Sequence, residues 1–146
     1  MTEPANAPIA ASSNPESSGP DSTTSDIGER ITELLGEGTT FEVEMVREII
    51  ASFLGRTVDL MQRLTLAVAA DDADATYLHA HSLAGAGLNL GTLDVVRISR
   101  EIESDAKSGR PGQSVARLVQ LEVALDRARI QLRELSAGLP VGSSVE

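Results

Sequence analysis

His81 and Gly85 lie one helical turn apart in the stretch Tyr77–Gly91, whose sequence is YLHAHSLAGAGLNLG. At about 100° per residue, the apolar positions of this stretch fall on the side of a helix opposite His81, so the imidazole points into water. Ala84 and Gly85, which follow His81 by three and four residues, have almost no side chain, and a glycine inside a helix costs about 1 kcal/mol relative to alanine. The pattern indicates that another molecule approaches the helix closely at His81.

A metal site is a poor alternative for this stretch. His79 and His81 are two residues apart and point about 200° away from each other on a helix. The chain has no cysteine, which excludes a thiolate site, and no other cluster of metal ligands is evident. We therefore expect no metal and no resident cofactor, and the simplest alternative for His81 is an ordinary exposed histidine.

The elements that position His81 are predicted to be helices, because apolar residues recur every three to four positions and no stretch alternates with period two. Capping boxes are expected at Asp26–Glu29 and Thr39–Glu42. Gly91, which can take a positive φ, is expected to end the helix that carries His81. We predict a helix from 26 to 35, and a second that starts at the Thr39 box and continues to about 70. Three more are expected after the candidate caps Asp71 and Asp72 to about 88, from about 92 to 107, and between the turn at 108–112 and Gly138. Short connections favour an all-α fold, an antiparallel four-helix bundle with a short extra N-terminal helix.

Composition limits the classes of function. The chain has 146 residues and a net charge of −10, which argues against nucleic acid or an anionic membrane as a partner. We expect a disordered tail at 1–25, the bundle at 26–137 and a second tail at 138–146. No apolar run approaches the roughly 20 residues of a membrane span, and no signal peptide is evident, so the expected location is the cytoplasm.

The run from His81 to Gly91 resembles the signature of histidine phosphotransfer (HPt) domains, which has the form H-x-L-K-G followed six residues later by Gly. The matching residues are His81, Leu83, Gly85 and Gly91. The helix order, the loop lengths and the later stretch ISREIESDAKSGR are also similar to the family. The resemblance covers about residues 26–136.

This resemblance implies a monomeric phosphorelay intermediate that carries a phosphoryl group on His81. The group would come from a receiver-domain aspartate or a histidine kinase and pass to another receiver, which would bring its own Mg²⁺. The chain departs from the family at Ala84, where the usual residue is a lysine thought to help hold the phosphoryl group.

Two further roles are predicted on the next helix. Glu103 is the candidate hydrogen-bond partner that orients the His81 imidazole, since it also matches a position where the family often carries an acid or amide. Arg100 and Lys107 lie on the same stripe as Glu103, so either could supply the cation missing at Ala84. All three could instead be plain surface charges.

Tyr77, Leu78 and Leu88 flank the exposed side of the His81 helix within about 60°. Isolated surface apolar residues are normal, but three beside a proposed nucleophile favour a docking patch for a receiver helix.

Two rival functions remain open. The substitution at Ala84 favours a non-catalytic scaffold that binds a receiver or kinase without relaying phosphate, and a purely structural or dimerisation bundle is the third possibility. A kinase is disfavoured because no glycine-rich nucleotide-binding loop follows a strand. A receiver is disfavoured because the strands that would carry its acidic pocket are absent.

Overall fold

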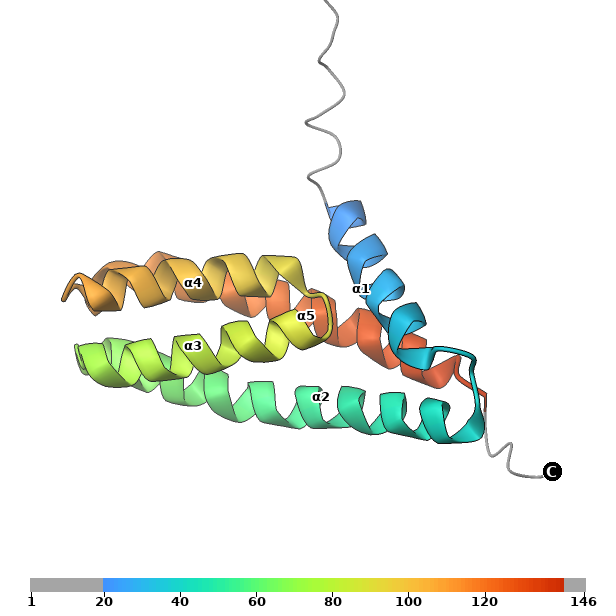
Figure 1. Cartoon of the computed structure of the whole chain (residues 1–146). Coiled ribbons are helices and arrows are strands. Elements are labelled where there is room, and N and C mark those ends of the chain that lie inside the picture. Colours follow the sequence, from blue (N-terminus) through green and yellow to red (C-terminus); the bar gives the residue numbers. More distant parts are fainter. Residues whose placement is uncertain (1–19, 141–146) are drawn as a thin grey trace, which may run out of the picture.

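The computed structural model describes residues 20–140, and the elements in that range are all helical (Figure 1). They are α1 (Pro20–Leu35), α2 (Thr40–Ala69), α3 (Ala73–Asn89), α4 (Leu93–Lys107), a short 3₁₀ helix at Pro111–Ser114, and α5 (Val115–Ala137). Helices α2 to α5 lie side by side as a bundle, and α1 leans across the end where α2 begins and α5 ends (Figure 1). The all-α prediction is confirmed.

The core is built from aliphatic side chains, as the low aromatic content requires. Leu83 of α3, Ile102 of α4 and Leu125 of α5 are fully buried, and Phe53 is the aromatic residue among them. Burying each such side chain contributes about 1.5–3 kcal/mol. The outward faces of these helices are consequently left free to carry polar and reactive groups.

Two of the predicted helix starts are confirmed. The carboxylate of Glu42 accepts a hydrogen bond from the Thr39 backbone N–H at 3.0 Å, and the Glu42 N–H donates to the Thr39 hydroxyl at 3.2 Å. The Thr39 N–H lowers the pKa of Glu42 from its ordinary 4.5, because it stabilises the ionised carboxylate. Asp72 caps α3 by accepting from the Ala75 N–H at 3.0 Å.

The predicted start of α1 is wrong. This helix begins at Pro20, so Asp26 lies within it and cannot be its N-cap. The rest of the predicted N-terminal tail, 1–19, lies outside the described residues, as does 141–146. At the other end Leu139 is buried, and Arg47 donates to the Pro140 carbonyl at 2.7 Å, so the first residues after α5 pack on the bundle.

The turn between α3 and α4 brings these two helices close together. A Cβ on Gly87 would lie 2.8 Å from the Thr92 hydroxyl, so only glycine fits there without displacing a neighbour. Gly91 takes the predicted positive φ, at +73°, and a Cβ there would meet the Asp26 carbonyl of α1 at 2.9 Å. This turn fixes how α3, with His81, lies over α4.

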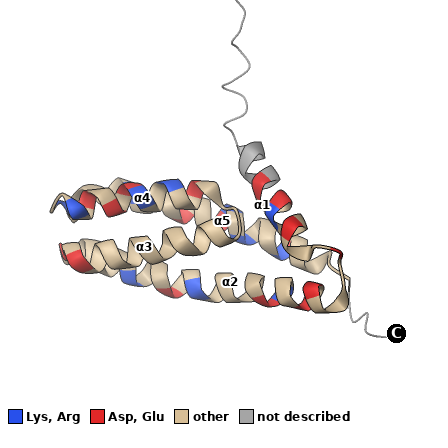
Figure 2. Ribbon diagram, in the orientation of Figure 1, with Lys and Arg blue, Asp and Glu red and all other residues tan. Residues whose placement is uncertain are grey.

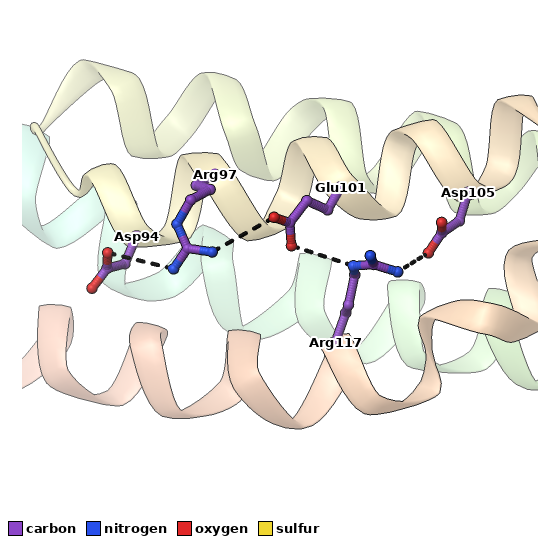
Figure 3. Close-up of polar contacts among 5 residues, drawn as sticks. All are labelled: Asp94, Arg97, Glu101, Asp105 and Arg117. Atoms are coloured by element: carbon purple, nitrogen blue, oxygen red, sulfur yellow. Dashed lines mark hydrogen bonds and ion pairs between the residues drawn. The ribbon is translucent and has the colours of Figure 1, made fainter. Parts of the chain in front are cut away.

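Helix α4 is tied to α5 by a chain of ion pairs (Figure 3). Arg117 of α5 contacts Glu101 at 3.3 Å and Asp105 at 2.6 Å, and Arg97 bridges Glu101 to Asp94. These contacts set the position of α4 from the side away from α3.

Candidate functional site

His81 lies in the middle of α3 on its exposed side. Its side chain is 65% exposed, whereas Leu83, two residues later, is fully buried. The amphipathic pattern of α3 therefore places the imidazole in water, as the sequence predicted.

Glu103 of α4 is the partner of His81, as predicted. The distance between Nδ1 of His81 and Oε2 of Glu103 is 2.7 Å, and the Glu103 side chain is only 15% exposed. A carboxylate accepts hydrogen bonds, so the neutral imidazole must carry its proton on Nδ1 to make this contact. The Nε2 lone pair is then left free on the exposed edge of the ring.

Tyr77 lies one turn before His81, and its ring stacks on the imidazole. The ring centroids are 5.8 Å apart and the planes are inclined by 16°. Stacking together with the Glu103 hydrogen bond restricts the rotation of the His81 side chain. The sequence predicts Tyr77 in a docking patch but not this contact, although the spacing of four residues on a helix is compatible with it.

The two small residues after His81 differ in their surroundings. A Cβ on Gly85 would meet nothing within 4 Å, so the surface beside His81 is open there. Ala84, predicted together with Gly85 to let another molecule approach His81, is only 3% exposed, so that prediction is wrong for Ala84, which packs in the core. The residue three positions after His81 turns about 60° toward the core, whereas the residue four positions after turns only about 40° the other way.

Of the three residues predicted to flank the site, Leu78 and Leu88 are exposed and Tyr77 is half-buried. Leu78 is 58% and Leu88 49% exposed, one on each side of His81 along α3. Asp74 is the one charged residue of this helix, so the ridge around His81 is nearly uncharged while the neighbouring helices carry many charges (Figure 2). An uncharged, partly apolar ridge on an acidic protein is suited to docking another protein surface.

The predicted cations, Arg100 and Lys107, are exposed on α4, and within 20–140 neither makes a hydrogen bond or ion pair. The structure places no contact between them and His81 or Glu103. A different cation, Arg56 of α2, lines an open groove that also contains Ser82 and Gly85. Sequence reasoning missed Arg56.

Arg56 could have been found from the short turn between α2 and α3. Counting 13 residues back from Ala69 reaches Arg56, and 13 residues forward from Ala73 reaches Ala86. Antiparallel helices with a three-residue connection therefore bring Arg56 level with the end of the His81 turn.

The described residues hold no group of three or more His, Asp or Glu side chains that could bind a metal ion. Within the same range no helix is long and apolar enough to cross a membrane.

Comparison with protein families finds a match over residues 48–136 to a family described as Hpt domain. This range contains α3 and α4 whole, α5 except for its last residue, most of α2, and every residue assigned to the site above. Comparison with curated proteins and with solved structures finds no match.

Proposed function

The chain belongs to the Hpt domain family, since the match covers more than half of it, and on this premise we propose that the protein carries a phosphoryl group on Nε2 of His81 between two-component signalling partners. Domains of this family act as phosphotransfer carriers and not as kinases. The donor is a receiver-domain phospho-aspartate or a histidine kinase, and the acceptor is a second receiver. The observation that carries the proposal is the His81–Glu103 hydrogen bond, which leaves Nε2 free on an open surface.

The transfer step follows from this geometry. The Nε2 lone pair attacks phosphorus in line, the N–P bond forms, and the P–O bond to the donor aspartate breaks with its electron pair left on the carboxylate. The proton on Nδ1 does not need to leave, so the ring gains positive charge as the bond forms. The nearby Glu103 carboxylate stabilises that charge, and transfer to the next aspartate reverses the step.

The open surface at Gly85 supports the same proposal. In-line transfer requires a partner aspartate, with the Mg²⁺ held by its own domain, to come within bonding reach of Nε2. Leu78 and Leu88 provide apolar area on the ridge where such a partner would dock.

The test is phosphoryl transfer from a panel of phosphorylated receiver domains to the wild type, to His81→Gln and to His79→Gln. His79→Gln is the matched control, because it removes the other imidazole from the same helix. We expect acid-labile, alkali-stable label on the wild type and on His79→Gln, and none on His81→Gln. Receiver binding that survives in His81→Gln, with no label on the wild type from any donor, would contradict a relay and favour the scaffold.

A further inference from the structure

An open groove runs along the seam between α2 and α3 and reaches the turn of α3 that follows His81. Arg56 lines it from α2, and Ser82, Gly85 and Asn89 line it from α3. Ser82 is the residue next to His81, and Gly85 lies one turn after it. His81 itself does not line the groove, but the groove reaches Gly85, which borders the exposed side of α3 where His81 lies.

The phosphoryl site needs a positive charge that α3 does not provide. A phosphoryl group carries about two negative charges at neutral pH, and the protein around it has a net charge of −10. Helix α3 contains no Lys or Arg, and the position where the resemblance predicts a lysine holds the buried Ala84. A cation must come from a neighbouring helix or from the partner.

Arg56 is placed to supply that charge. It is exposed, and within the described part of the chain its guanidinium makes no hydrogen bond or ion pair that would hold it elsewhere. By contrast, Arg47 and Arg63 of the same helix are held by other groups. Arg100 and Lys107 are also free of partners, but they lie on α4 and do not line the groove at Gly85.

We propose that Arg56 binds the non-bridging oxygens of the phosphoryl group during its transfer to and from His81, and replaces from α2 the cation that Ala84 removes from α3. This inference rests on the proposed function of His81. A guanidinium presents paired N–H donors that match two phosphate oxygens, and its long stem allows it to reach along the groove. Arg56 forms and breaks no covalent bond, because the N–P bond still forms only at Nε2.

The experiment measures single-turnover transfer from a phosphorylated receiver as a function of receiver concentration, in the wild type, Arg56→Gln, Arg56→Lys and Arg63→Gln. Arg63 is the matched control, because it is an exposed arginine of α2 that is paired with Asp59 at 2.8 Å and lies outside the groove. Phosphorylation of each variant by phosphoramidate, a small chemical donor, gives a readout that needs no partner protein. Circular dichroism and urea unfolding check that the variants fold.

We expect Arg56→Gln to lower the limiting transfer rate by about tenfold, since loss of one oxyanion donor costs a hundredfold or more in enclosed sites and less at an exposed one. The receiver concentration at half-maximal rate should change by less than about twofold, Arg56→Lys should recover part of the rate, and Arg63→Gln should match the wild type.

Two results would overturn the inference while the relay stands: an Arg56→Gln rate equal to wild type, or a change confined to the half-maximal receiver concentration, which would make Arg56 a docking charge. A wild type that takes no phosphoryl group from any receiver or from phosphoramidate would instead remove the proposed function, and this inference with it.

Discussion

The carboxylates on the two sides of α4 differ in how they are paired. On the flank toward α3, Glu103 makes one hydrogen bond to an exposed imidazole whose other nitrogen is free. On the flank toward α5, the carboxylates of Glu101 and Asp105 are both paired with Arg117, and Asp105 also accepts a hydrogen bond from Ser114 (Figure 3). On the α5 flank both carboxylates are paired with a cation, whereas in the reactive pair Nε2 of His81 has no partner among residues 20–140. The difference separates residues that should affect transfer from residues that should affect stability.

After the loss of His81 itself, the largest effect on transfer is expected at Glu103. Glu103→Ala removes the acceptor that fixes the His81 tautomer and stabilises the charged ring. We expect the transfer rate to fall roughly 10–100-fold, the range found when the partner that orients a metal-binding histidine is mutated. Receiver binding should be retained. Single-turnover transfer measures the rate, and a rate within twofold of wild type would remove the distinction between the two flanks.

The reciprocal change is Arg117→Gln on the opposite flank. It deprives Glu101 and Asp105 of their shared partner, so we expect the free energy of unfolding to fall by about 1–2 kcal/mol, as for hydrogen bonds to charged groups. Transfer by the folded protein should be unchanged. Urea unfolding and single-turnover transfer on the same preparation test both halves, and slow transfer with unchanged stability would contradict the assignment.

Gly85 and Gly87 of α3 allow a test of the difference between the open surface beside His81 and the packed contact with α4. Gly85→Ala should raise stability by up to about 1 kcal/mol, because its Cβ enters open space and alanine favours the helix. Gly87→Ala should lower stability, because its Cβ would lie 2.8 Å from the Thr92 hydroxyl. Thermal unfolding of the pair measures the difference, and the same sign for both would show that the α3–α4 packing is described wrongly.

The smallest effect is expected at Glu42, far from the site at the start of α2. The pKa of Glu42 is lowered from 4.5 by the Thr39 N–H, so the folded state favours its ionised form. The ionised Glu42 carboxylate therefore stabilises the folded state at pH values above its ordinary pKa. This stabilisation is lost as the pH falls through the lowered pKa of the folded state. Glu42→Ala should therefore be less stable than wild type at neutral pH, and the gap should narrow in urea unfolding at about pH 3. A stability difference between wild type and Glu42→Ala that grows on acidification would show that the pKa of Glu42 is raised in the folded state and not lowered.

Local features of the fold were predictable from the sequence. The Thr39–Glu42 box, the Asp72 cap and the positive φ of Gly91 depend on a few neighbouring residues with specific side-chain or backbone requirements. The start of α1 was not predictable in this way, because the sequence 20–25 contains many residues of low helix propensity. Its helical state in the structure overrides the capping signal at Asp26.

The site was predictable only in part. His81 and Gly85 follow from helical periodicity, and Glu103 was chosen with the help of the family resemblance; its 2.7 Å contact is confirmed by the structure. Ala84 was misplaced because an angular count does not say how wide a face the neighbouring helix covers. Arg56 was missed because its place beside Gly85 depends on the pairing of α2 with α3 and not on any motif.

The most direct test of the account is imidazole nitrogen NMR on the ¹⁵N-labelled protein before and after treatment with phosphoramidate. We expect neutral His81 to carry its proton on Nδ1, held by Glu103, and phosphorus to become coupled to Nε2 of the same ring. A proton on Nε2 of the free protein, or a phosphoryl group on Nδ1 or on His79, would contradict the central claim that Glu103 leaves Nε2 of His81 as the acceptor.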